Sequence, residues 1–166
     1  DDPNGPARAG LDRQLKARPP AFMDTARAAL IGIGNTRDNL ELLRDCDLVI
    51  EAIIEQLEPK RELYARLEEL LSPAAIVASN TSGLPMKDLV AGRSKGFGER
   101  FVGMHFFNPP RYLHLLEIIA APTTTAATLA TVRQFSERVL GKGTIRAKDV
   151  PGFVANLERL IAAAPR

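Results

Sequence analysis

The alternation of short apolar runs with longer stretches of helical periodicity is the feature that most constrains how this chain folds. Compact apolar runs such as 48–52 are typical of strands that are buried on both faces of a sheet. Between such runs, 59–71 and 125–140 carry apolar residues at the spacing of an amphipathic helix. Strands that alternate with helices of this length form βαβ units. The sequence therefore predicts an α/β fold with a mainly parallel sheet and helices on both faces.

The same patterns predict the remaining elements. Beyond the two long helices, helical segments are expected at 7–16, at 24–30 with Asp24 as N-cap, from 35 or 36 to 44, near 85–90, and from about Gly152. Strands are expected at 31–34, 48–52, 75–78, 101–105, 115–119 and 144–146. The segment 93–98 is polar and rich in glycine, which predicts a loop.

Composition argues against several classes of protein. The formal net charge is only +2, so the total charge does not suggest a protein that binds nucleic acid. No apolar run approaches the roughly 20 residues that span a bilayer, and the start of the chain has no signal-peptide pattern. The single cysteine, Cys46, excludes an internal disulfide and fits a reducing compartment. We therefore expect a cytoplasmic protein with no membrane or nucleic-acid partner.

Polar side chains follow several of the predicted strands, at the ends where open α/β sheets bind their ligands. They are Glu55 and Lys60 after 48–52, the run Ser79, Asn80, Thr81 and Ser82 at the end of 75–78, and His105 and Asn108 at the end of 101–105. Taken singly, each has an ordinary interpretation, because Ser, Asn and Thr make common turns and a helix lysine is usually solvated. Taken together, they favour an active site over a packing surface.

His105 and Glu117 form the sharpest pair. A turn after Asn108 could bring their strands side by side and antiparallel, with both side chains on one face. A glutamate inside an apolar strand is costly unless it is paired, and a carboxylate beside an imidazole orients the ring and raises its basicity. The alternative is a hydrogen-bonded core histidine beside a strand-edge charge, and spacing alone does not decide between the two.

Other chemistries find little support. The chain has two histidines and one cysteine, without the spacing of a metal site. No serine lies in a G-x-S-x-G pattern. Gly32 and Gly34 suggest a dinucleotide-binding G-x-G-x-x-G, but Arg37 occupies the third glycine position. We interpret Gly34 as a turn residue, so the phosphate loop of a dinucleotide site is not expected in this chain.

Taken in order, the motifs resemble the 3-hydroxyacyl-CoA dehydrogenase family from Asp47 to about Asn156. The resemblance rests on five pieces in the right order and spacing: 47–55 with Lys60, 79–82, 103–110, 116–118, and 148–153 with Asn156. It implies NAD-dependent oxidation of (3S)-3-hydroxyacyl-CoA to 3-oxoacyl-CoA in fatty-acid β-oxidation.

The resemblance also implies roles for individual residues. His105 would remove the 3-hydroxyl proton while hydride passes to the nicotinamide, and Glu117 would orient His105. Ser82 and Asn156 would hydrogen-bond the substrate oxygen. The residues that would contact NAD or the adjoining CoA end are Ala52, Glu55, Lys60 and Asn108.

The resemblance further implies a division of the chain. A helical segment and linker within the dinucleotide-binding domain would occupy 1–30, and the rest of a Rossmann-like NAD-binding domain with the catalytic residues would occupy 31–150. Residues 151–166 would begin the helix that leads to a C-terminal domain. The family's glycine-rich βαβ unit and its C-terminal domain are not found in the sequence. We therefore expect a fragment with a sheet incomplete at its N-terminal side, little or no activity by itself, and any homodimer formed through regions outside this chain.

Two other functions fit the same residues. A related NAD-dependent dehydrogenase could act on a small hydroxy acid or a sugar acid, because the His–Glu pair alone does not specify CoA. A non-catalytic α/β module could instead use its sheet edge for association. Loss of turnover in a His105→Ala variant would separate the enzymes from that module.

Overall fold

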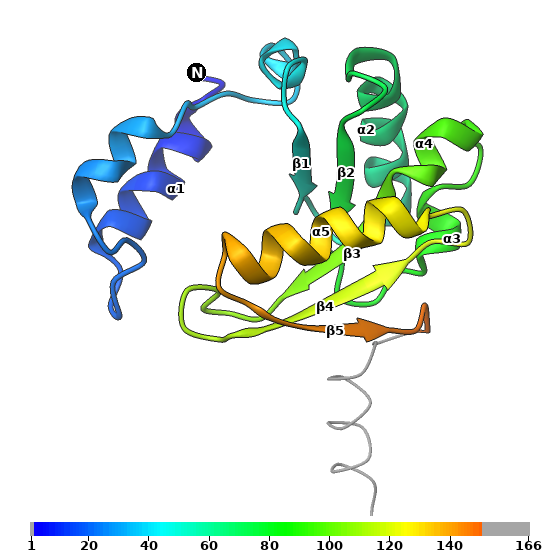
Figure 1. The fold of residues 1–166 in the computed structure, drawn as a ribbon. Coiled ribbons are helices and arrows are strands. Elements are labelled where there is room, and N and C mark those ends of the chain that lie inside the picture. The colour runs from blue at the N-terminus through cyan, green and yellow to red at the C-terminus, as the bar shows by residue number, and fades with distance from the viewer. Residues whose placement is uncertain (1, 151–166) are drawn as a thin grey trace, which may run out of the picture. The chain divides into compact units, whose positions relative to one another are not determined.

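The computed structural model describes residues 2–150, which form two compact units that divide after Arg44 (Figure 1). The first unit contains α1 (Gly5–Lys16), the 3₁₀ helix η1 (Thr25–Leu30) and the 3₁₀ helix η2 (Leu40–Leu43). The second unit contains the sheet and the remaining helices. Among the described residues, no helix is long and apolar enough to cross a membrane.

The first unit confirms two predicted helices and corrects two other predictions. Asp24 caps η1 as expected, because its side chain accepts a hydrogen bond from the Ala26 amide at 2.9 Å. The predicted strand at 31–34 is wrong, since this stretch is irregular and pairs with no strand among residues 2–150. Of the helix predicted from 35 or 36 to 44, only the 3₁₀ helix η2 is present. The first part of the predicted segment is a turn, in which the Asn35 side chain accepts hydrogen bonds from the amides of Arg37 and Asp38.

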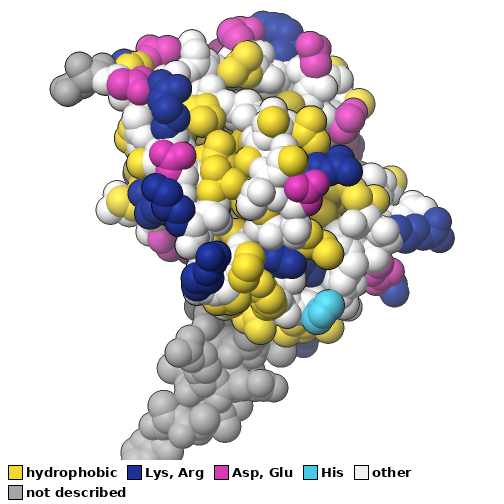
Figure 2. All heavy atoms as spheres, turned by 90° about the vertical axis from the view of Figure 1, so that its left-hand side faces the viewer, with side chains coloured by type: hydrophobic (Ala, Val, Ile, Leu, Met, Phe, Trp, Pro, Cys, Tyr) yellow, Lys and Arg dark blue, Asp and Glu magenta, His cyan; other side chains and the backbone are white. Residues whose placement is uncertain are grey.

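Hydrophobic side chains remain exposed in this unit. Met23 is 90% exposed, Leu30 76% and Leu42 67%, and none of the helical residues of the unit is buried. Figure 2 shows one face of the molecule, on which hydrophobic side chains gather among charged ones. Packing in the first unit is therefore slight, and the core of the protein lies in the second unit.

The second unit is built on a five-stranded sheet with the order β1-β2-β3-β4-β5. β1, β2 and β3 run parallel, β3 and β4 are antiparallel, and β4 and β5 are parallel again. The strands are β1 (Leu48–Glu51), β2 (Ile76–Ser79), β3 (Phe101–Phe106), β4 (Leu115–Ala120) and β5 (Gly143–Ala147). The predicted α/β class and mainly parallel sheet are confirmed, and β1 forms one edge of the sheet.

Helices cover both faces of this sheet, as predicted (Figure 1). Successive residues of β3 point to opposite faces. Phe101 meets the ring of Tyr64 from α2 (Leu57–Leu70), with 5.1 Å between ring centroids. Val102 belongs instead to the cluster that contains Val132 of α5 (Ala126–Arg138). The two helices cover opposite faces because strand direction reverses between β3 and β4. A right-handed crossover from β1 to β2 then places α2 on one face, and a right-handed crossover from β4 to β5 places α5 on the other.

Two short helices follow β2. They are α3 (Met86–Leu89) and α4 (Lys95–Glu99). The loop predicted at 93–98 is therefore wrong. Ser94 caps α4 by accepting a hydrogen bond from the Phe97 amide at 3.2 Å, and the Phe97 ring is buried against Phe101. Burial of an aromatic ring and a capped first turn outweigh the low helix propensity of the glycines. The helix expected from Gly152 lies outside the described residues.

Candidate active site

His105 and Glu117 face each other across the antiparallel pair β3 and β4. They are register partners, and His105 Nδ1 lies 2.6 Å from Glu117 Oε2. The Glu117 side chain is fully buried, and the His105 side chain is 10% exposed. The predicted pairing on one face is confirmed. With the proton on Nδ1 directed at the carboxylate, Nε2 is the basic nitrogen of the ring.

The turn between β3 and β4 is fixed by hydrogen bonds to its backbone. The amides of Tyr112 and Leu113 donate to the carbonyl of Pro109 at 3.0 and 3.1 Å. The Lys142 ammonium, which follows α5, donates to the carbonyls of Pro110 and Leu113. Asn108 is exposed at the start of this turn. The turn therefore holds the ends of the two strands that carry His105 and Glu117.

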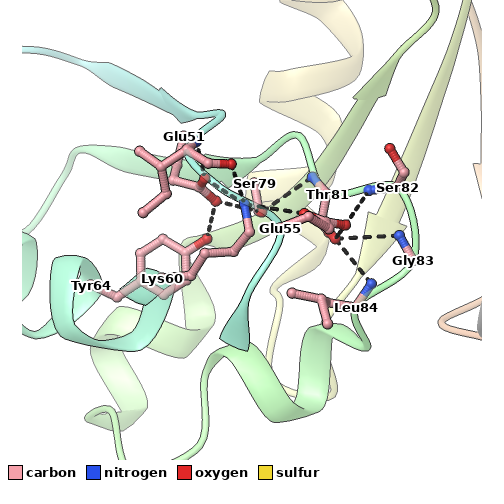
Figure 3. Close-up of polar contacts among 10 residues, drawn as sticks. Glu51, Glu55, Lys60, Tyr64, Ser79, Thr81, Ser82, Gly83 and Leu84 are labelled. Atoms are coloured by element: carbon pink, nitrogen blue, oxygen red, sulfur yellow. Dashed lines mark hydrogen bonds and ion pairs between the residues drawn. The ribbon is translucent and has the colours of Figure 1, made fainter. Parts of the chain in front are cut away.

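Ser82 lies on a tightly bonded segment, residues 81–84, which follows β2 (Figure 3). Glu55 Oε1 accepts hydrogen bonds from the Thr81 hydroxyl at 2.5 Å and from the Ser82 amide at 2.8 Å. Thr81 Oγ1 in turn accepts from the amides of Gly83 and Leu84. Thr81 is buried and Ser82 is exposed, so the segment presents the serine at the surface.

Glu55 carries a shifted pKa because of these contacts. Burial by itself raises the pKa of the Glu55 carboxyl, but the hydrogen bonds from Thr81 and the Ser82 amide and the charge of Lys60 outweigh it. The net result is a pKa below the ordinary value of a glutamate. Glu55 is therefore ionised when it holds the segment.

Beneath Glu55 lies a buried polar network centred on Glu51. Its carboxylate accepts hydrogen bonds from Lys60 at 2.6 Å, from the Tyr64 hydroxyl at 2.5 Å and from Ser79 at 2.8 Å. Lys60 is only 1% exposed, and its ammonium also lies 3.3 Å from Glu55 Oε2. Lys60 is thus an internal cation, and its expected contact with NAD stays a prediction.

The sequence analysis assigned no role to two acidic residues that the structure shows in structural contacts, Glu51 and Asp149. Glu51 could have been found by the signal that identified Glu117, an acid inside an apolar run. Lys60 and Tyr64, which lie one helical turn apart on α2, are its hydrogen-bond donors from that helix. Asp149 accepts hydrogen bonds from the Met86 and Lys87 amides, at 2.7 and 3.2 Å. These hydrogen bonds connect the chain after β5 to the start of α3. No local sequence pattern predicts a contact between segments so far apart in sequence.

Asn80 joins the three parallel strands at their carboxyl ends. Its amide donates to the Glu51 carbonyl at 2.7 Å, and its side-chain oxygen accepts a hydrogen bond from the Phe106 amide at 2.9 Å. The carboxyl ends of β1, β2 and β3 therefore lie side by side at one end of the sheet, which we call the carboxyl edge. Ala52 is exposed directly after β1 at this edge. Asn156 lies outside the described residues, and its expected contact with the substrate stays a prediction.

The comparisons with known proteins identify the family of the chain. A family described as the NAD-binding domain of 3-hydroxyacyl-CoA dehydrogenase matches residues 7–150. A probable 3-hydroxyacyl-CoA dehydrogenase of Deinococcus radiodurans is 53% identical over 155 residues, which cover 93% of this chain and 45% of that protein.

Two solved structures are also similar. FadB2 of M. tuberculosis has a TM-score of 0.78 and 33% identity, with 93% of this chain and 53% of that chain covered. A 5-formyl-3-hydroxy-2-methylpyridine 4-carboxylic acid 5-dehydrogenase, an NAD⁺-dependent dismutase, has a TM-score of 0.68 and 39% identity, with 75% and 41% covered.

These matches define the class first: the chain is an NAD-binding α/β domain of an oxidoreductase. Within that class, the chain belongs to the 3-hydroxyacyl-CoA dehydrogenase family. It spans about half the length of the relatives named above.

Proposed function

We propose that the protein containing this chain oxidises the 3-hydroxyl group of a (3S)-3-hydroxyacyl-CoA to a 3-oxo group with NAD, as in fatty-acid β-oxidation. The observation that carries the proposal is the contact of 2.6 Å between His105 Nδ1 and the buried carboxylate of Glu117. A histidine held in this way suits the removal of a hydroxyl proton near neutral pH. Membership of the family supports the choice of substrate and cofactor.

In the proposed reaction His105 Nε2 takes the proton of the 3-hydroxyl group. Bound NAD would supply the acceptor for the hydride that leaves C3. Glu117 keeps the imidazole oriented and stabilises its positive charge after it has taken the proton. The Ser82 hydroxyl donates a hydrogen bond to the substrate oxygen, where negative charge develops, and Asn156 is proposed for the same task.

The carboxyl edge of β1 to β3 has features that fit a dinucleotide. Ala52 is small and exposed, so a flat ligand can approach the backbone there. Glu55 is partly exposed and ionised, so it can accept hydrogen bonds from ligand hydroxyl groups while it holds the Ser82 segment. We propose that Ala52, Glu55, Lys60 and Asn108 form the contact with NAD, Lys60 through its ion pair with Glu55.

A second candidate keeps the reaction and changes the substrate. The dismutase relative is 39% identical to this chain, and the substrate in its name is a pyridine carboxylic acid and not a CoA thioester. The His–Glu pair would serve an alcohol of either kind. Turnover of the natural protein on 3-hydroxyacyl-CoA and on free hydroxy acids, measured as NADH formed, separates the two candidates.

The central test is a His105→Ala variant of the natural protein. We expect turnover to fall at least about a hundredfold, the usual contribution of a general base, while the Kd for NAD stays within a factor of about two. His114→Ala is the matched control, because His114 is the other histidine and is exposed. A His105→Ala variant with unchanged turnover would exclude His105 as the base and favour a non-catalytic module.

Location and assembly belong to the same proposal. We propose a cytoplasmic enzyme, supported by a chain with one cysteine and hence no internal disulfide. We propose acyl-CoA as the small-molecule partner and a homodimer as the assembly. The mass of the natural protein in solution tests the assembly.

A further inference from the structure

Glu51 is a buried acid to which the proposed reaction and cofactor binding give no role. It ends β1, the residue is 3% exposed, and its carboxylate accepts hydrogen bonds from a cation, two hydroxyls and the Ile53 amide. A carboxylate inside a protein is costly unless it is paired and fully hydrogen-bonded. The partners of Glu51 meet that requirement, so the charge is built into the fold.

Lys60 connects this buried acid to the segment that carries Ser82. Its ammonium lies 2.6 Å from Glu51 Oε1 and 3.3 Å from Glu55 Oε2, between the two carboxylates. The other oxygen of Glu55 accepts the hydrogen bonds of the Thr81 hydroxyl and the Ser82 amide. Figure 3 shows this continuous series of contacts, from the end of β1 through α2 to the loop after β2.

We propose that Glu51 is a positioning residue that fixes the Ser82 segment through Lys60 and Glu55. The inference rests on the proposed function in one respect, the contact of Ser82 with the substrate oxygen. Without the Glu51 charge, the buried ammonium of Lys60 keeps one carboxylate, which is 45% exposed, and the Ile53 carbonyl at 3.3 Å. A buried cation with so little compensation rearranges, and Glu55 then loses its fixed position.

Tyr64 provides a matched control within the same network. Its hydroxyl donates to Glu51 Oε2, the oxygen that Ser79 also contacts, whereas Lys60 contacts Oε1. Tyr64→Phe therefore removes a buried hydrogen bond of the same carboxylate and leaves the connection from Lys60 to Glu55 in place. Burial and the hydrogen bond to Glu51 both raise the pKa of Tyr64, so its hydroxyl stays protonated as a donor.

The test is amide hydrogen exchange of the full chain, measured by NMR. In Glu51→Gln we expect the Ser82 amide to exchange at least about tenfold faster relative to the amides of β3 and β4, because hydrogen bonds to charged groups are the strong ones. In Tyr64→Phe we expect the exchange rate of the Ser82 amide to change only by the same factor as the exchange rates of the amides of β3 and β4. Unchanged relative exchange in Glu51→Gln, or an equal relative change in both variants, would overturn the proposal.

A double variant covers the case in which Glu51→Gln alone does not fold. Glu51→Gln with Lys60→Met removes both buried charges, a change that proteins tolerate better than the loss of one partner. The Ser82 amide should again exchange faster relative to β3 and β4, and an unchanged rate would count against the proposal. Because exchange needs no substrate, failure of the dehydrogenase assay would refute the proposed function and leave this result standing.

A turnover assay of the natural protein gives the second readout. Glu51→Gln should lower kcat about tenfold, less than the roughly hundredfold loss that follows removal of a hydrogen-bond donor to the transition state, with little change in the KM for acyl-CoA. Tyr64→Phe should lower kcat by less. Equal kcat values in the two variants would indicate a role in stability alone.

Discussion

Two buried glutamates in apolar strands show how the partners of a residue determine its use. Glu117 is fully buried and faces an imidazole, a side chain that can accept a proton from a substrate. Glu51 is buried against an ammonium and two hydroxyls, all of which donate hydrogen bonds to its carboxylate. The first arrangement suits proton transfer, and the second suits a fixed anion. The same residue type therefore supports chemistry in one strand and position in another.

Glu55 gives a prediction about acid stability. Its folded pKa is below the ordinary value near 4.5, so it stabilises the fold above that pH, and the contribution is lost as the pH falls through the folded pKa. In Glu55→Gln we expect a lower free energy of unfolding than in the natural sequence at neutral pH. In acid, we expect the free energies of unfolding of the two proteins to differ less. Denaturant unfolding at a series of pH values measures both.

The control for this prediction is Glu62→Gln, which removes one negative charge from an exposed position of α2. A difference between Glu55→Gln and the natural sequence that stays constant down to strongly acidic pH would contradict the assignment. It would mean that the contacts of Glu55 with Thr81 and the Ser82 amide do not favour the ionised carboxylate.

At the scale of elements, the pair β3 and β4 positions the site because its strands pack closely against α3. Gly103 lies opposite Ile119 in the register. A Cβ at Gly103 would lie 2.9 Å from the sulfur of Met86 and 3.0 Å from Cβ of Ile119. Both neighbours are fully buried, so neither has space to move away. The glycine is therefore required by close approach and not by backbone conformation.

We accordingly expect Gly103→Ala to destabilise the fold by about 1–3 kcal/mol, the usual cost of overpacking a core. Gly96→Ala is the matched control, because a Cβ there would meet only Ser94 Oγ at 4.0 Å and the residue lies within α4. It should stabilise by up to about 1 kcal/mol, since alanine is the better helix former. Denaturant unfolding compares the two, and equal stabilities would contradict the packing argument.

At the scale of the whole molecule, the described part of the chain offers only part of a dinucleotide site. Within residues 2–150 no strand precedes β1, and Gly32 and Gly34 lie in irregular backbone. A Rossmann fold holds the pyrophosphate of NAD at a glycine-rich turn between its first strand and helix. The carboxyl ends of β1 to β3 are where we propose that other parts of the dinucleotide bind, but the described residues there lack that phosphate site.

We therefore expect that the 166-residue chain by itself does not bind NAD tightly. Titration calorimetry with NAD measures this directly. Heat that fits a micromolar Kd would contradict the prediction and would require a phosphate site that the described residues do not contain.

The sequence by itself determined the α/β class, most of the strands and the pair of His105 and Glu117. Periodicity and the cost of an unpaired acid are local signals, and five motifs in order carried the resemblance to the family. Only the tertiary structure decided that Lys60 is buried between two carboxylates, that 93–98 contains a helix, and that 31–34 is not a strand. Those outcomes depend on packing and pairing in the folded chain: the buried Glu51 for Lys60, the ring of Phe101 in β3 for Phe97, and, within the described residues, no strand that pairs with 31–34. Local propensity is weak beside such contacts, which explains where the interpretation of the sequence failed.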